Sequence, residues 1–398
     1  MSNTTYKLFA DKMGGTNAND FIGNAGDIFY DPESTSLRIS NGNQGGVTLG
    51  GGTVALDSNY SLYIGGGGTN NTTGYENIAT GTNALWSNTT GYDNIATGYG
   101  ALNSNTSGVY NIATGIDALS SNTTGWENIA LGYNALYSNT SGSDNIATGI
   151  DALFSNTTGD YNIATGSQAL EHNTTGSLNI ATGTGALRNN TTGHYNIATG
   201  LEALYSNTSG EYNIATGINA LNSNTTGYSN IATGNRSLYY NTTGSNNIAI
   251  GYRALLSNTT GSNIATGFLA LYFNTTGSSN IATGFEALYS NTTGNYNIGI
   301  GDGAGVFITT GSNNTIIGNL AGSSTLSGTV LIGAGSTERI KVNSTGLYIN
   351  GSLLSGTVMM PPQASTAPTY VKGAIYFDTT LNKLRVGGAT DWETITSV

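Results

Sequence analysis

A 17-residue unit repeats through residues 74–311 and restricts the folds that this chain can adopt. One copy reads Gly91-Tyr-Asp-Asn-Ile-Ala-Thr-Gly-Tyr-Gly-Ala-Leu-Asn-Ser-Asn-Thr-Ser, and the next copy begins at Gly108. We number the positions of each unit 1 to 17 from its first glycine. The period is broken once, because the unit that begins at Gly261 is one residue shorter and the next begins at Gly277. A short fixed period indicates a solenoid or an array of stacked units.

Four positions of the unit hold almost the same residue in every copy: Asn at position 4, Ile at 5, Gly at 8 and Leu at 12. A unit this short cannot contain two strands and a helix, so we expect an all-β fold, a parallel β-solenoid (β-roll) with one unit per coil. Each coil is predicted to contain a short strand, a glycine turn, a second short strand and an Asn-Thr-Thr-Gly turn. The side chains predicted to form the structural ladder, with asparagines hydrogen-bonded along the stack, include Asn77, Ile78, Gly81, Leu85, Asn94, Ile95, Gly98 and Leu102.

Alternation along the first strand of a coil separates two faces, with Ile78 and Thr80 on one and Asn77 and Ala79 on the other. The threonine column contains larger apolar residues in three units, namely Leu131, Ile250 and Ile300. We therefore predict that the isoleucine and threonine columns point into the core. The alanine column stays small throughout, so we predict that another backbone approaches it closely.

The predicted core is thin, because only one Ile and one Leu per coil would oppose the conformational entropy lost when the whole coil is ordered. We therefore expect several copies to pack side by side along the alanine face, as a parallel homotrimer.

Composition excludes several classes of function. Only 8% of the 398 residues are charged, the net charge is −11, and the repeats contain three basic residues, so we expect no nucleic-acid binding. There is no cysteine, His172 and His194 lie in different units, and the acidic residues are scattered, so we expect no metal, no cofactor and no enzymatic activity. No run of about 18 apolar residues occurs, and the first residues lack an apolar signal segment, so we expect neither membrane insertion nor a signal peptide.

A similar hairpin pattern stands near each end of the chain. Gly26 precedes Asp31 by five residues and Leu37 by eleven, and Gly373 precedes Asp378 and Leu384 by the same numbers. Both patterns predict a β-hairpin that caps or attaches the solenoid.

These features divide the chain into four predicted parts. They are an N-terminal segment with a hairpin (1–57), the solenoid (58–311), degenerate repeats and neck strands (312–357), and a proline-containing linker with the C-terminal hairpin (358–398).

The Asn-Ile-Ala-Thr-Gly elements, such as residues 77–81, and the Thr-Ile-Ile-Gly element at 315–318 resemble the head repeats of trimeric autotransporter adhesins. Those heads are parallel β-rolls, but the present chain differs from them in its 17-residue coils, its threonine column and the lack of a coiled-coil stalk or membrane barrel. The hairpins resemble modules of tailed-bacteriophage tail fibres and other virion structural proteins. Together the resemblances imply a homotrimeric fibre at the virion surface, released by host lysis, which contacts other virion proteins and a bacterial surface glycan or protein.

Aromatic side chains occupy the positions that vary most between units. A tyrosine ring is flat and apolar with a polar tip, which suits sugar rings and protein interfaces alike. The candidate glycan contacts are Trp86, Tyr92, Trp126, Tyr137, Phe154, Tyr205, Tyr239, Tyr272 and Tyr289. Packing between neighbouring chains is the alternative role for these rings.

Two other functions are compatible with the repeats. One is a purely structural virion filament or head fibre without a receptor. The other is an ice-binding solenoid, which the regular threonine column suggests, although Leu131, Ile250 and Ile300 interrupt that column.

Overall fold

The computed structural model describes residues 60–66 and 71–353, together with the backbone of strands outside these ranges. Within these parts the protein is all-β, and it forms the predicted parallel β-solenoid with one repeat unit per coil. No helix in the described parts is long and apolar enough to cross a membrane. The chain divides into two compact units, Met1–Gly261 and Ser262–Val398, at the start of the shortened repeat.

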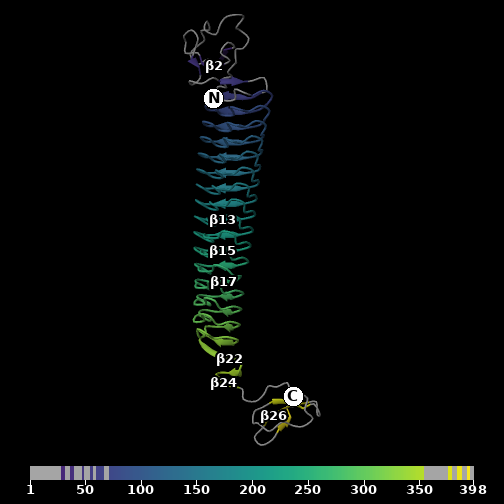
Figure 1. Cartoon of the computed structure of the whole chain (residues 1–398), viewed down its shortest axis with the longest axis vertical. Helices are drawn as coiled ribbons and strands as arrows, with labels where there is room; N and C mark the ends of the chain where they lie inside the picture. Colours follow the sequence, from purple (N-terminus) through teal and green to yellow (C-terminus); the bar gives the residue numbers. More distant parts are fainter. Residues whose placement is uncertain are drawn as a thin grey trace, which may run out of the picture. The chain divides into compact units, whose positions relative to one another are not determined.

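In the first unit each coil contributes one three-residue strand, and neighbouring strands pair in parallel (Figure 1). The register is constant, so that Ile163, Ala164 and Thr165 pair with Ile180, Ala181 and Thr182 of the next coil. These strands are β5 (Leu62–Ile64), β6 (Ile78–Thr80), β7 (Ile95–Thr97), β8 (Ile112–Thr114), β9 (Ile129–Leu131), β10 (Ile146–Thr148), β11 (Ile163–Thr165), β12 (Ile180–Thr182), β13 (Ile197–Thr199), β14 (Ile214–Thr216), β15 (Ile231–Thr233) and β16 (Ile248–Ile250). At the start of the ladder, β4 (Val54–Leu56) pairs antiparallel with β5.

The second unit continues the same pattern and then changes it. Its parallel strands are β17 (Ile264–Thr266), β18 (Ile281–Thr283), β19 (Ile298–Ile300), β20 (Thr315–Ile317) and β21 (Val330–Ala334). An antiparallel meander follows, made of β22 (Thr337–Asn343), β23 (Gly346–Ile349) and β24 (Ser352–Leu353). The last parallel strand is therefore paired on both sides instead of presenting a free edge.

Both predicted hairpins are present. β1 (Ile28–Asp31) pairs antiparallel with β2 (Ser36–Ile39), and β25 (Ile375–Asp378) pairs antiparallel with β26 (Lys383–Gly387). Each hairpin also has a third antiparallel strand that was not predicted, β3 (Val47–Thr48) or β27 (Trp392–Thr394). The proline-containing linker lies outside the described residues, and the four predicted domain limits stay predictions.

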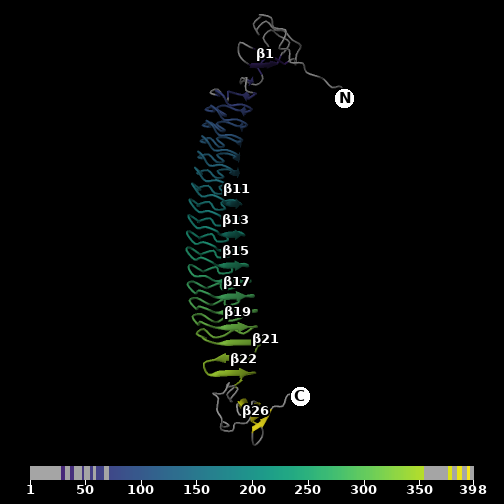
Figure 2. The same ribbon diagram turned by 90° about the vertical axis from the view of Figure 1, so that its right-hand side faces the viewer.

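The second strand predicted in each coil is wrong, because positions 9 to 14 form consecutive turns. Ala84 N–H donates to the carbonyl of Gly81, and Asn88 N–H donates to that of Leu85. In the first of these turns the third residue, Asn83, has φ 61°, as a type II turn requires. We call the side of the coils that carries the strands the β-wall and the side formed by positions 10 to 14 the turn wall. Figure 2 shows the strands along one side of the coils and the turns along the other.

The predicted orientation of the strand is also wrong. Ala79 and its counterparts in the other described coils are fully buried, whereas Ile78 is 41% exposed. Gly299, which takes the alanine position in its coil, shows the reason. A Cβ atom there would lie 2.9 Å from Leu288 Cγ and 3.0 Å from the Ala304 carbonyl oxygen. At this coil the two walls are so close that only a small side chain fits between them, so the alanine column of the repeats faces the chain's own turn wall and not another chain.

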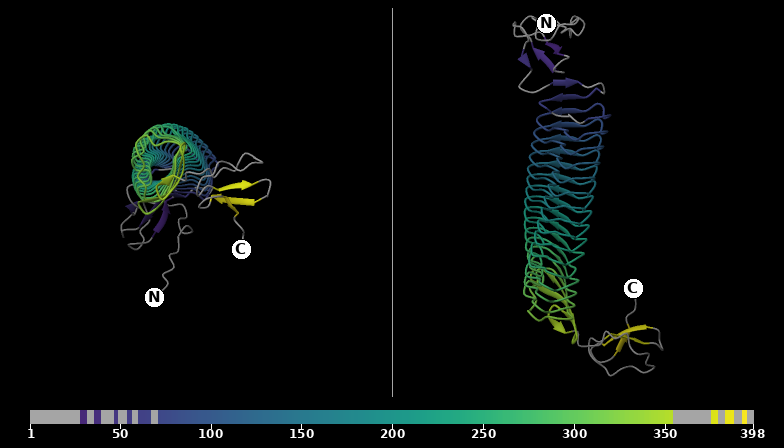
Figure 3. Two further views of the ribbon diagram at one scale, coloured as in Figure 1. Left: turned by 90° about the horizontal axis from the view of Figure 1, so that it is seen from below. Right: turned by 45° about the horizontal axis from the view of Figure 1, so that its top comes forward.

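Two buried asparagine ladders complete the interior of the coils, whose backbone Figure 3 shows from one end. At position 4, Asn94 Nδ2 donates to Asn77 Oδ1 at 3.1 Å, as the sequence predicted for that column. At position 15, Asn105 Nδ2 donates to Asn88 Oδ1 at 2.8 Å, in a second ladder that was assigned only to a turn. The ladders meet at the position-1 glycine, where the Gly91 carbonyl accepts from Asn77 and Asn88, both at 2.9 Å. These buried amides therefore find their partners inside the stack.

Candidate functional site

The β-wall presents an apolar surface to solvent. Its isoleucines at position 5 are exposed or half-buried, although each is flanked by the isoleucines of the neighbouring coils. Leu131 and Ile250, which replace threonine at position 7, are 38% and 42% exposed, so these substitutions lie on the outer face and not in the core.

Position 9, just beyond the corner glycine, extends this surface. In the first unit it holds seven large exposed side chains, namely Tyr99, Ile116, Tyr133, Ile150, Leu201, Ile218 and Tyr252. Soluble monomers rarely expose a continuous apolar surface of this kind, and such surfaces mark sites of interaction.

The predicted aromatic residues fall into two separate groups. Seven of them occupy position 13 on the turn wall, namely Trp86, Tyr137, Phe154, Tyr205, Tyr239, Tyr272 and Tyr289. Tyr92 and Trp126 lie instead at position 2, beside the asparagine corner, where Tyr92 stacks on Tyr75 with a centroid distance of 4.7 Å. The sequence already places these groups at different positions of the unit, and the structure shows that they lie on different sides of the coil.

Several rings at position 13 stack on one another. The centroids of Tyr137 and Phe154 are 5.2 Å apart with nearly parallel planes, and those of Tyr272 and Tyr289 are 5.3 Å apart. Each ring of such a pair covers one face of the other, so less of the ring surface is available to a ligand. Trp86 differs, because it is 39% exposed and no ring in the described part of the chain stacks on it.

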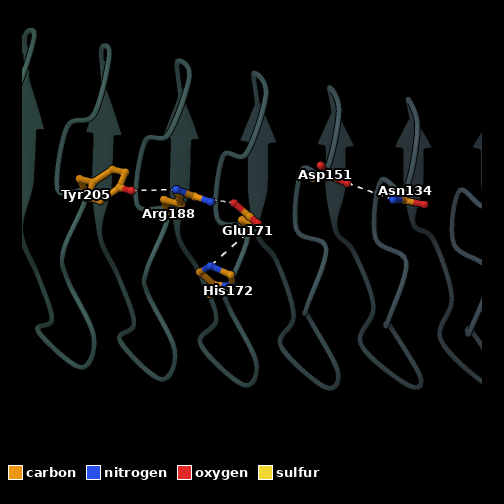
Figure 4. A network of polar contacts seen from close by, with 6 residues as sticks. All are labelled: Asn134, Asp151, Glu171, His172, Arg188 and Tyr205. Atoms are coloured by element: carbon orange, nitrogen blue, oxygen red, sulfur yellow. Dashed lines mark hydrogen bonds and ion pairs between the residues drawn. The ribbon is translucent and has the colours of Figure 1, made fainter.

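A polar network joins three successive coils at the same position (Figure 4). Arg188 Nε donates to Glu171 Oε2, and Arg188 Nη1 donates to the Tyr205 hydroxyl at 2.8 Å. The hydrogen bond to Glu171 is the main cause that raises the pKa of Arg188. His172 Nε2 lies 3.9 Å from Glu171 Oε1. Because Arg188 and Glu171 are oppositely charged and hydrogen-bonded, this network crosslinks the coils.

Two other titratable side chains also form hydrogen bonds between coils. Asn134 donates to Asp151 at 3.1 Å, and His194 Nδ1 accepts the backbone N–H of Ser177 at 3.0 Å. Among the described residues no three His, Asp or Glu side chains are grouped so that they could hold a metal ion.

No protein-family model matches the chain, and a search of curated proteins finds no significant match. We therefore infer function from the two walls.

Proposed function

We propose that the chain is a non-enzymatic subunit of a homotrimeric virion fibre, of the kind with which tailed bacteriophages attach to the surface of a bacterium. The observation that carries the proposal is the exposed apolar β-wall, which repeats in register from coil to coil. Covering an exposed apolar surface that runs along many coils with another apolar surface removes it from water, which is favourable.

The chemistry of the β-wall suits a second and third copy of the same chain. Positions 5 and 7 hold only Ile, Leu and Thr between residues 78 and 317, so copies can meet there without burying a charge. The constant spacing of the repeats lets each coil of one copy lie beside a coil of another. In this arrangement the trimer packs along the isoleucine face and not along the alanine face expected from the sequence.

The turn wall would then face outward and provide the adhesive surface. Its residues at positions 10 and 13 vary from coil to coil and include most of the aromatic residues named above, which suit a surface glycan or a protein receptor. The hairpin modules at the two ends, which are similar to virion modules in sequence, would contact other virion proteins.

The mass of the intact chain in solution tests the assembly. Light scattering coupled to size exclusion should give a species of about three times the chain mass of 40.8 kDa. A stable monomer would refute the trimer. Binding of labelled protein to whole bacteria and to isolated envelopes tests adhesion, and a trimer that binds neither would be a filament or head fibre without a receptor.

One observation favours ice binding as a second candidate. The threonine column, predicted to be buried, lies on the outer face beside the isoleucine column, and successive strands repeat it at about 4.8 Å. Leu131 and Ile250 still interrupt it. Ice binding requires the β-wall to be exposed, whereas a trimer covers it. Thermal hysteresis shown by a monomer would therefore support ice binding and refute the trimeric fibre.

A further inference from the structure

Two arginines on the turn wall of the first unit form a feature that the proposed function does not explain. Arg236 and Arg253 occupy position 10 in consecutive coils, so their backbones are one ladder spacing apart, about 4.8 Å. Between residues 71 and 338 the only other basic residue, histidines aside, is Arg188. Two of the three arginines between residues 71 and 338 thus occupy the same position in consecutive coils.

Unlike Arg188, these two arginines have no acidic partner in the described part of the chain. Arg188 is paired with Glu171, whereas neither Arg236 nor Arg253 forms an ion pair there. The Nε atom of Arg253 is shielded from solvent and has no hydrogen-bond partner. In the position-10 column the nearest acid on the N-terminal side is Glu202, two coils away from Arg236. The pair therefore lacks a counter-ion within the described part of the first unit.

Tyrosine rings take the place of acidic partners. Arg236 Cζ lies 5.7 Å from the centroid of the Tyr239 ring, and Arg253 Cζ lies 4.9 Å from that of Tyr252. Tyr240 packs edge-on against Tyr239 at 4.7 Å. Cation–π contacts of this kind hold a guanidinium in place and leave its charge uncompensated.

We infer that this arginine pair binds the carboxylate of a uronate unit in an acidic bacterial polysaccharide, with Tyr239 and Tyr240 of the turn wall against the sugar ring. The planar guanidinium donates two parallel hydrogen bonds to a carboxylate, and tyrosine suits the apolar face of a pyranose. Other coils carry Asp117, Asp151 or Glu202 at position 10, which would repel the same ligand. The inference rests on the proposed adhesive role of the turn wall and names the ligand class for one part of it.

Binding of the full-length chain to polygalacturonate tests the inference, with neutral dextran and inorganic polyphosphate as comparison polymers. The double variant R236Q/R253Q should bind polygalacturonate about tenfold more weakly or worse, because charge-assisted hydrogen bonds are lost. The matched control R188Q removes an arginine that already has an acidic partner. The affinity of R188Q for polygalacturonate should stay within about twofold of that of the unaltered chain. Circular dichroism checks that both variants keep the β-solenoid.

Three results would overturn the inference: no binding of polygalacturonate, equal binding by R236Q/R253Q, or equal binding of polyphosphate. Binding of the protein to whole cells measures adhesion in a separate experiment. Cell binding that R236Q/R253Q leaves unchanged would reject the arginine site and keep the adhesive fibre. Polygalacturonate binding without cell binding would reject the adhesive fibre and keep the site.

Discussion

Leu170 illustrates the conformational demands of this repeat at the level of single residues. Its φ is 52°, and Gln168 and Tyr161 in the same coil have φ values of 58° and 57°. A non-glycine residue in the left-handed region costs about 1–2 kcal/mol. The leucine side chain offsets this cost because it is fully buried between the walls. Glycine and asparagine mark some positions of positive φ in the sequence, such as Gly185 and Asn83, but the leucine at position 12 could not be recognised from residue type.

Gly149, a corner glycine, should tolerate no side chain. Its φ is 139°, and a Cβ atom would lie 2.5 Å from the carbonyl oxygen of Gly166 in the next coil. We expect Gly149→Ala to lower the free energy of unfolding by about 2–5 kcal/mol through strain and overpacking. Urea unfolding measures the effect. Gly185→Ala is the control, because its φ of 64° is also positive but its nearest neighbour is 3.5 Å away. Equal losses in the two variants would contradict the steric explanation.

Asn162 should be essential to the position-4 ladder. Its Nδ2 donates to Asn145 Oδ1 and to the Gly176 carbonyl, and its Oδ1 accepts from the backbone and side chain of Asn179. Asn162→Ala leaves several buried groups without partners and should cost about 3–5 kcal/mol. Asn189→Ala, at a half-buried turn position, should change stability by less than about 0.5 kcal/mol. Thermal unfolding compares the two, and a small loss for Asn162→Ala would mean that water replaces the amide.

At the scale of the element, each coil is a single strand closed by turns. The strand is short because corner glycines such as Gly81, with φ 126°, end it after three residues. The following turns bring the leucine column over the alanine column, as Leu288 lies beside Gly299 of the next coil, and the walls then lie close enough to exclude larger side chains there. Coil width is therefore set by the turns and not by the strand.

The turns offer a route to higher stability. Gln168 is the third residue of a turn closed by the hydrogen bond from Ala169 N–H to the Gly166 carbonyl. Asparagine tolerates the left-handed region better than glutamine, and it occupies the same position at Asn83, Asn134 and Asn219. We expect Gln168→Asn to raise stability by about 0.5–1 kcal/mol, measured by thermal unfolding. Gln168→Ala should give no gain in stability. An equal gain from Gln168→Asn and Gln168→Ala would mean that the effect comes from loss of the long side chain.

At the scale of the whole molecule, the difference between the two walls decides how the chain interacts. The β-wall is uniform, with Ile, Thr and Leu at positions 5 and 7 and no charge there, whereas the turn wall varies from coil to coil and carries the paired and unpaired charges described above. A uniform surface suits contacts between identical copies, and a variable surface suits a specific ligand.

Charges placed on the β-wall should therefore break the assembly. Ile180 and Ile197 lie in consecutive coils, and Ile180→Glu with Ile197→Glu would bury six carboxylates in a trimer. We expect the mass measured by light scattering to fall to that of the 40.8 kDa monomer. The control replaces Ser206 and Ser223 by Glu at equivalent spacing on the turn wall and should leave the mass unchanged. A trimer that survives the β-wall substitutions would place the interface elsewhere.

The sequence by itself determined the parallel β-solenoid, the coil length, the corner glycines, the hydrogen-bonded column of Asn77 and Asn94, and a hairpin at each end. A strict period and glycine placement specify these features locally. Only the tertiary structure decided which side of the strand is inside, because alternation defines two faces and does not say how far away the opposite wall lies. That distance places Ala79 in the core and Ile78 on the surface, and it moves the predicted interface from the alanine face to the isoleucine face. The stacking of Tyr137 on Phe154, and the lack of an acidic partner for Arg236 and Arg253 in the described part of the chain, likewise depend on how the turns fold back between strands.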